Sequence, residues 1–227
     1  MKKKKTILAA IVLLLVFVVG GAIAYFTDTD TKTNTFTIGN VDIDLVETAW
    51  DALPDEDNDD IPDAAEDMMP GEFVTKDPVI RNLSTKNPAY VFVKLQVPCS
   101  KKVTKPGDPN PTVLSPVELF TYSINTAWSE LTTAAVACTD SGTATHVYYY
   151  VGSGTTMIPL GKAANESTPT AAPALFVDNK VTLRGTLESD QIPNPTVAKN
   201  IVVTGYGIQT EGLASTAPAD VWGYLNN

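Results

Sequence analysis

The stretch Thr33–Val46, TNTFTIGNVDIDLV, decides the fold class of this chain. Polar and apolar residues alternate along it, which is the pattern of a β-strand with one buried face. The alternation slips by one residue near Gly39-Asn40, where a β-bulge would absorb the extra residue. The stretch therefore predicts an extended strand whose apolar positions are Phe36, Ile38, Val41, Ile43 and Leu45.

Further runs rich in Val, Ile, Thr, Tyr and Phe also predict strands. They are Phe73–Arg81, Ala89–Val97, Leu119–Ile124, His146–Val151, Phe176–Leu183 and Ile201–Gln209. Segments rich in Pro, Gly, Asn and Ser separate them and are predicted loops, because proline lacks a ladder donor and glycine supplies positive φ. These loops are Lys105–Pro111, Gly152–Thr156 and Asn165–Pro173.

Helical patterns are scarce. Ala127–Ala137 fits either a short helix or a strand, whereas Ala217–Leu225 places Val221, Trp222 and Leu225 at helical spacing. Because strands and helices do not alternate, we expect an all-β fold, a jelly-roll-like antiparallel β-sandwich with a short C-terminal helical segment. About 200 residues suffice for one such domain, predicted over residues 25–227.

The N-terminus, residues 1–24, has the three parts of a secretory signal peptide. Lys2–Lys5 form a positive n-region, Thr6–Val19 form an apolar h-region, and Ala22-Ile23-Ala24 supplies the small-x-small recognition site. We expect cleavage between Ala24 and Tyr25, and hence a protein secreted to the extracellular space or the cell surface. A retained anchor is the alternative, because Ile7–Ala24 nearly reaches the roughly 20 apolar residues of a membrane span.

The charge of the chain excludes some partners. It has 16 basic and 26 acidic residues, a net charge of −10, which becomes −14 once Lys2–Lys5 leave with the signal peptide. So acidic a surface repels nucleic acid and anionic lipid, so we expect neither as a partner. The same charge suits solubility and divalent cations.

Cys99 and Cys138 are the only cysteines. In an oxidising compartment such a pair can form a disulfide, but the sequence gives no distance between them. Two small buried hydrophobic side chains are the alternative.

The most acidic stretch, residues 55–66, fits a twelve-residue EF-hand-type calcium loop. Calcium requires six to eight oxygens, and alternating residues of a tight loop can direct them inward. The ligands expected at positions 1, 3, 5, 7, 9 and 12, the seventh through a backbone carbonyl, are Asp55, Asp57, Asp59, Ile61, Asp63 and Glu66.

One position of this loop departs from the pattern. Asp60 occupies the sixth position, where glycine usually permits a sharp turn. Aspartate tolerates the left-handed conformation better than most residues, which weakens the expected calcium site without excluding it. A solvated acidic insertion is the alternative.

The sequence carries no catalytic motif that we recognise. His146 is the only histidine, so the HExxH motif of zinc peptidases is absent, and so is the G-x-S-x-G nucleophile elbow. On a predicted strand beside Tyr148, Tyr149 and Tyr150, His146 is expected to be structural. We therefore expect neither an enzyme nor a small-molecule substrate.

Several segments together resemble one family of secreted and cell-surface proteins, the TasA/camelysin (CalY) family. The resemblance includes the signal-peptide junction processed by a SipW-type signal peptidase, the following strands and the C-terminal end. The matching segments are Gly20–Asp28, Asn34–Val41, Pro70-Gly71-Glu72, Lys76-Asp77-Pro78, Ala89–Lys94, Tyr206–Gln209 and Val221-Trp222.

This resemblance implies a jelly-roll-like subunit of biofilm-matrix or cell-surface fibres. In such fibres, the segment freed by signal-peptide cleavage inserts as a strand into the next subunit. Tyr25–Thr37 suits a donor strand, because it is rich in threonine and contains neither proline nor glycine. The implied partners are further copies of the chain, the SipW-type signal peptidase and another matrix protein.

Two other functions stay open at this point. One is a monomeric calcium-binding module of the cell surface, which the acidic loop alone would support. The other is the metalloprotease activity attributed to camelysin relatives, against which the single histidine argues.

Overall fold

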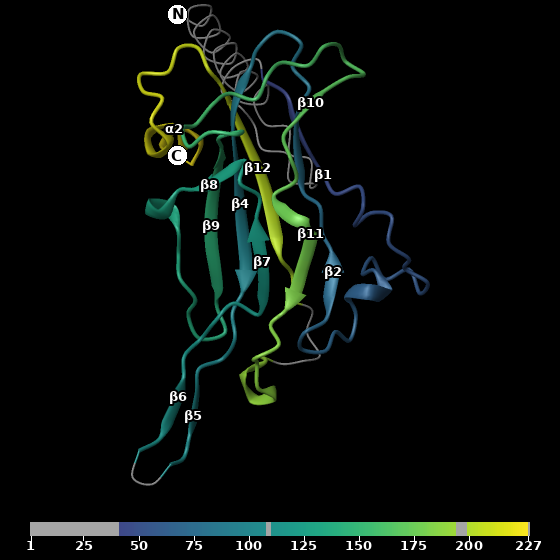
Figure 1. Ribbon diagram of the computed structural model, residues 1–227, viewed down its shortest axis with the longest axis vertical. Helices are drawn as coiled ribbons and strands as arrows, with labels where there is room; N and C mark the ends of the chain where they lie inside the picture. The colour runs from purple at the N-terminus through teal and green to yellow at the C-terminus, as the bar shows by residue number, and fades with distance from the viewer. Residues whose placement is uncertain (1–40, 108–109, 194–198, 227) are drawn as a thin grey trace, which may run out of the picture. The chain divides into compact units, whose positions relative to one another are not determined.

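Strand β4, Ala89–Pro98, lies at the centre of the β domain (Figure 1). Its side chains alternate between two hydrophobic clusters. Val91, Val93 and Leu95 belong to the main core, whereas Phe92 belongs to a second cluster on the opposite face. A strand buried on both faces needs apolar residues at almost every position, as the sequence AYVFVKLQVP shows.

The computed structural model describes residues 41–107, 110–193 and 199–226, all of which lie in the compact unit Asn34–Asn227. The predicted signal peptide, its cleavage site Ala24–Tyr25 and the predicted donor strand 25–37 lie outside the described residues. Of the predicted strand Thr33–Val46, the described part forms β1, Ile43–Val46. Among the described residues, no helix is long and apolar enough to cross a membrane.

The strands pair antiparallel in every pair that the structure describes. One sheet has four strands in the order β12–β4–β9–β8, and two sheets have three strands each, in the orders β2–β11–β7 and β1–β3–β10. Their bounds are β2 Phe73–Thr75, β3 Val79–Asn82, β7 Phe120–Ile124, β8 Trp128–Glu130, β9 Thr143–Tyr150, β10 Thr170–Ala171, β11 Phe176–Leu183 and β12 Val202–Gln209.

The main core lies between the four-stranded sheet and the two three-stranded sheets. Val93 of β4 and Tyr148 of β9 share one hydrophobic cluster with Ile80 of β3, Phe120 of β7 and Phe176 of β11. Apolar side chains of facing sheets that meet in this way make a β-sandwich. The predicted all-β class and antiparallel pairing are confirmed.

A short C-terminal helix covers the other face of the four-stranded sheet. This helix, α2, spans Pro218–Leu225, which confirms the helical prediction for this region. The ring of Trp222 lies 5.6 Å from that of Phe92 and 4.9 Å from that of Tyr206, measured between centroids. The helix therefore closes the second hydrophobic cluster.

Two glycines of β12 allow the sheets to approach closely. A Cβ at Gly207 would lie 2.8 Å from the Cγ2 atom of Ile43, and one at Gly205 would lie 3.3 Å from the Cδ1 atom of Ile80. A side chain at Gly207 would have to displace the side chain of Ile43, so glycine here serves packing rather than ligand binding.

Two predictions of local structure need correction, and two short strands were not predicted. Phe73–Arg81 forms two strands instead of one, because Lys76–Pro78 leaves the ladder and proline cannot donate to it. Asn165–Pro173, predicted as a loop, contains β10. The predicted loop Lys105–Pro111 lies outside the strands in its described residues after Lys105, and two short strands that were not predicted flank it, β5 Val103–Lys105 and β6 Thr112–Leu114. The undecided Ala127–Ala137 contains both β8 and a 3₁₀ turn, Thr132–Ala134.

Candidate metal site

The acidic loop connects β1 to β2 and is fixed at its start by residues of the segment between β2 and β3. The carboxylate of Asp77 accepts hydrogen bonds from the backbone N–H groups of Ala49, at 2.8 and 3.0 Å, and Trp50, at 3.0 Å. Lys76 forms a 2.9 Å ion pair with Glu47, and its ammonium lies 4.7 Å from the Trp50 ring centroid. The loop therefore begins from a fixed position on the sandwich.

Asp55 organises the first half of the loop. Its Oδ1 atom accepts hydrogen bonds from the N–H groups of Asn58, at 2.8 Å, and Asp59, at 3.3 Å, while Oδ2 accepts one from Asp60 at 3.1 Å. Asn58 and Asp60 have φ angles of 59° and 69°. Asp60 thus adopts the left-handed conformation that its position in a calcium loop requires.

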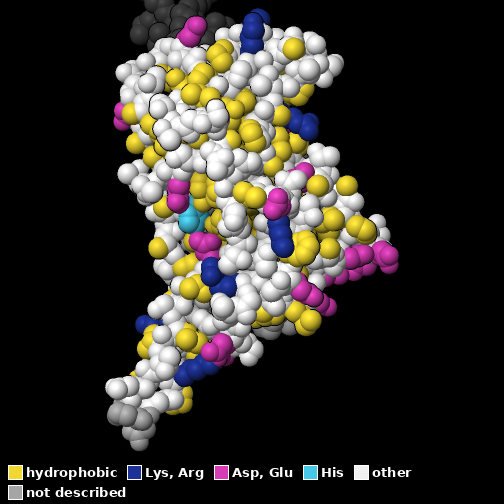
Figure 2. Space-filling view, in the orientation of Figure 1, with side chains coloured by type: hydrophobic (Ala, Val, Ile, Leu, Met, Phe, Trp, Pro, Cys, Tyr) yellow, Lys and Arg dark blue, Asp and Glu magenta, His cyan; other side chains and the backbone are white. Residues whose placement is uncertain are grey.

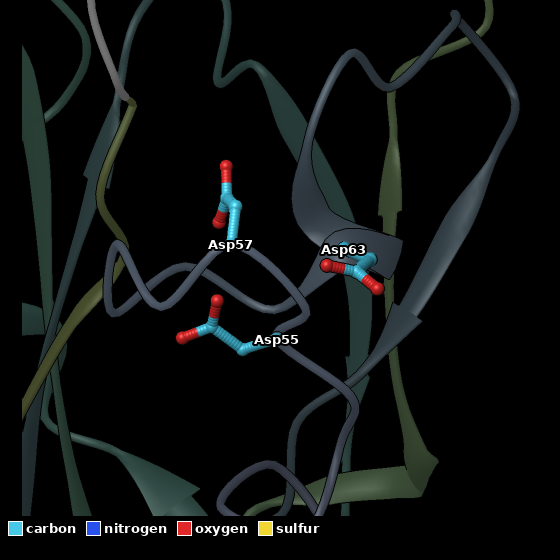
Figure 3. A group of neighbouring side chains, drawn as sticks. All are labelled: Asp55, Asp57 and Asp63. Atoms are coloured by element: carbon cyan, nitrogen blue, oxygen red, sulfur yellow. The ribbon is translucent and has the colours of Figure 1, made fainter.

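The second half of the loop folds back onto the first. The Oδ1 atom of Asp63 accepts a hydrogen bond from the N–H group of Glu56 at 3.0 Å, and Asp63–Ala65 forms a 3₁₀ turn, η1. This turn brings Asp63 beside Asp55 and Asp57 (Figure 3). Residues eight positions apart in sequence therefore meet in one group.

The five carboxylates predicted as ligands fall into two overlapping groups. Asp55, Asp57 and Asp63 form one, and Asp57, Asp59 and Glu66 form the other, with the potential ligand atoms of each group within 4.8 Å of one another. Asp57 belongs to both groups. Ile61, predicted to contribute its carbonyl, uses its N–H group to bond Asp59 Oδ1 at 2.9 Å.

Repulsion between neighbouring carboxylates raises the pKa of two of these groups. The negative charge of Asp59 raises the pKa of Asp57, and the charge of Asp57 in turn raises the pKa of Glu66. Both side chains are exposed, so water screens part of this repulsion. A bound cation would relieve it, because it would favour the ionised form of each carboxylate.

The donor set fits calcium better than zinc. Calcium takes six to eight oxygen ligands in a flexible geometry, and this loop offers carboxylate oxygens from alternate residues. Structural and catalytic zinc sites instead favour histidine nitrogen and cysteine sulfur. Neither acidic group found in the described residues includes a histidine or a cysteine.

A second cluster of acidic groups surrounds His146 of β9 (Figure 2). The Nδ1 atom lies 2.6 Å from Glu130 Oε1 of β8, and Nε2 lies 2.7 Å from Glu118 Oε1, just before β7. Tyr122 donates its hydroxyl hydrogen to Glu118 Oε2 at 2.9 Å, and Arg184 donates from Nε to the Glu118 carbonyl at 2.7 Å. The cluster therefore links the two layers of the sandwich.

The two glutamates hold a proton on His146. Hydrogen bonds to Glu118 and Glu130 raise the pKa of His146 to about 9, although burial opposes this shift. Burial alone would raise the pKa of Glu118, but hydrogen bonds from His146 and Tyr122 bring it below its usual value. Because burial raises the pKa of Tyr122, its hydroxyl stays a hydrogen-bond donor.

This geometry supports the structural role predicted for His146. The two glutamates contact opposite nitrogens of the ring, so one metal ion bound at either nitrogen could not also bind both carboxylates. The sequence did not single out Glu118 or Glu130. They precede His146 by 28 and 16 residues, and no local spacing marks them.

A disulfide joins Cys99 to Cys138, with a Cα–Cα distance of 5.7 Å. It encloses both Glu118 and Glu130 in one covalent loop. The sequence left this pairing open, because it gives no distance between two cysteines that are 39 positions apart.

Comparison with known families identifies the N-terminal part of the chain. Residues 1–105 match the family model described as camelysin metallo-endopeptidase. The match covers β1, the acidic loop and β2 to β4, and it ends with β5. No curated protein and no solved structure matches the chain.

The description of this family includes a metallo-endopeptidase activity, whereas the sequence led us to expect no enzyme. The acidic groups are the described residues that could hold a metal ion. The match over residues 1–105 agrees with the resemblance to the TasA/camelysin family that the N-terminal motifs carry.

Proposed function

We propose that the chain is a secreted structural subunit of biofilm-matrix or cell-surface fibres. After cleavage between Ala24 and Tyr25, residues 25–37 of one subunit would insert as a strand into the next. Calcium bound by the acidic loop would stabilise each subunit. Signal peptidase of the SipW type would act as the switch, because a tethered N-terminus cannot be donated.

The position of β12 is the observation that best supports this proposal. Val202–Gln209 is an eight-residue strand at the end of its sheet, and β4 is its one strand partner among the described residues. The free edge of such a strand offers N–H and C=O groups for a further strand. At about 3.3 Å per residue, β12 spans roughly 26 Å, which a 13-residue donor can cover.

A donated strand links subunits head to tail. Because donor and acceptor are different parts of the chain, the contact is heterologous and need not close into a ring. Repetition of a contact that does not close produces a filament. The acidic loop follows β1, so a calcium ion there would order the chain shortly after the donor segment.

Electron microscopy of the protein starting at Tyr25 tests the proposal, compared with a protein that lacks Tyr25–Thr37. Both are imaged with and without calcium. Filaments from the first protein alone would support strand donation. Dispersed monomers from both would contradict it and would favour a monomeric calcium-binding module of the cell surface.

Metallo-endopeptidase activity is the second candidate, favoured by the description of the matching family. An assay on unfolded protein substrates, with and without a metal chelator, measures it directly. Substitution of Asp57 by Asn should abolish the cleavage if the acidic groups hold the metal. Chelator-sensitive cleavage that survives this substitution would require a different metal site.

A further inference from the structure

We propose that Lys76 and Glu47 are joined by an intramolecular amide bond, formed by condensation of their side chains in the folded protein. The bond would link the chain just after β1 to the segment between β2 and β3, across 29 positions of sequence. It depends neither on strand donation nor on calcium, so it can be tested apart from the proposed function.

The observation behind this inference is a buried carboxylate oxygen without a partner. Glu47 Oε1 is the one buried side-chain oxygen or nitrogen of the described residues that has no hydrogen bond. The Oε2 atom lies 2.9 Å from Lys76 Nζ, and the side chains of Glu47 and Lys76 are only 20% and 9% exposed. Burying a charge without full hydrogen bonding is costly. An amide carries no charge, so condensation would remove this cost for both residues.

The surrounding chain holds the two side chains in place. Lys76 donates its backbone N–H to the Asn179 carbonyl at 2.8 Å. The adjacent Asp77, itself buried, accepts hydrogen bonds from the backbone N–H groups two and three residues after Glu47. The Nζ atom of Lys76 also lies over the Trp50 ring, 4.7 Å from its centroid. Reacting groups fixed in this way behave as if highly concentrated, which favours a condensation that is slow between free side chains.

The condensation needs no reagent beyond the two side chains. A proton first passes from the Lys76 ammonium to the Glu47 carboxylate, which leaves a neutral amine and a carboxylic acid, the forms that burial favours. The lone pair of Nζ then attacks Cδ of Glu47 and forms the new N–C bond. The bond from Cδ to Oε2 breaks, and this oxygen leaves as water with its own proton and one from the nitrogen. Neither an oxidant nor a reductant is consumed.

A second lysine–glutamate pair in the chain provides a matched control. Lys105 and Glu188 also form an ion pair, but their side chains are 38% and 46% exposed. Water hydrates both ions there, so the neutral amine and acid that the reaction requires are disfavoured. We therefore expect condensation at Lys76 and not at Lys105.

Mass spectrometry of the purified, disulfide-reduced protein tests the inference. We expect the intact protein to weigh one water less than its sequence, counted from the observed N-terminus. Trypsin cannot cleave after an acylated lysine, so Lys76 should lie inside a peptide that continues to Arg81. That peptide should lack one water, whereas peptides that contain Lys105 or Glu188 should have their full masses. A folded wild type of full mass that trypsin cleaves after Lys76 would overturn the proposal, and filaments formed by such a protein would leave the proposed function intact.

The variant K76R separates the bond from the ion pair. Arginine keeps a positive charge beside Glu47 but lacks the primary amine, so the full mass and tryptic cleavage at this position should return. A water deficit that persists in K76R would place the loss elsewhere, for example in an aspartate succinimide, and would overturn the proposal. If K76R does not fold, the peptide map of the wild type decides the question by itself.

Discussion

The acidic loop and the His146 cluster both bring carboxylates together, but only the cluster provides a positive charge between them. In the loop, five carboxylates, all exposed except the half-buried Asp55, lie within twelve residues of sequence, and the charge of Asp59 raises the pKa of Asp57. In the cluster, two partly buried glutamates flank an imidazolium, and the pKa of Glu118 is lowered. The carboxylates of the acidic loop therefore lack a counter-charge, whereas the glutamates of the cluster have one in His146.

This difference indicates which of the two regions can gain stability by binding an added ion. A group of like charges gains stability from an added cation, so the loop is suited to binding. A satisfied ion triad gains nothing from an added ion, so the cluster is suited to joining β7, β8 and β9.

Removal of the disulfide should have the largest effect, and it should affect the cluster rather than the loop. C99S/C138S opens a loop of 39 residues, which on chain-entropy grounds costs about 4 kcal/mol of stability. Urea denaturation monitored by tryptophan fluorescence measures this loss. Calcium should raise the melting temperature of the variant by the same amount as in the wild type, and loss of that increment would show that the two regions are linked.

Substitution of His146 by glutamine should leave Glu118 and Glu130 without a counter-charge. Breaking a buried charge pair costs several kcal/mol, and because this cluster is only partly buried we expect about 2 kcal/mol. Equilibrium denaturation at neutral pH measures this loss. The triple variant H146Q/E118Q/E130Q serves as the control and should recover part of the stability, because it removes the uncompensated charges as well.

Alkaline pH should weaken the cluster without any substitution. The pKa of His146 is about 9 in the folded protein and about 6.5 when unfolded, so folding favours its proton. This contribution is complete below pH 6.5 and is lost as pH rises through 9. Over this rise in pH we expect the free energy of unfolding to fall by about 1–2 kcal/mol in the wild type and by less in H146Q. Equal pH profiles for the two proteins would falsify the assignment.

The smallest effect should come from D57N/D59N in the acidic loop without calcium. Because these exposed groups repel each other, their neutralisation should slightly raise the melting temperature in the absence of calcium. With calcium, the variant should lose the increase that the wild type shows, and secretion should be unchanged. Differential scanning calorimetry gives both values. A wild-type melting temperature that is the same with and without calcium would contradict the proposed calcium site.

The same contrast explains what the sequence could predict. All side chains of the acidic loop lie within residues 55–66, so spacing alone grouped them, and Asp60 adopts the expected left-handed φ. The partners of His146 come from other elements, and only the sheet register places them beside it. Local spacing carries no information about such pairing.

The strands show a similar division. Phe176–Leu183 was predicted with the observed bounds, because apolar and β-branched residues mark both of its ends, although Asp178, Asn179 and Lys180 interrupt the pattern between them. Strands β5 and β6 were not predicted, because they have only three residues each on either side of the predicted loop Lys105–Pro111. Short strands that pack on no core leave little hydrophobic pattern to detect.

The covalent loop of 39 residues also has a mechanical consequence. If the chain were pulled from its two ends, tension would pass from Cys99 directly to Cys138, and the residues between them would carry no load. Roughly 130 Å of contour length would be withheld from extension, at about 3.4 Å per residue. β5 to β8 and both glutamates of the His146 cluster lie in that shielded segment, whereas the strands that pair with β7 and β8, namely β11 and β9, lie outside it and would be extended.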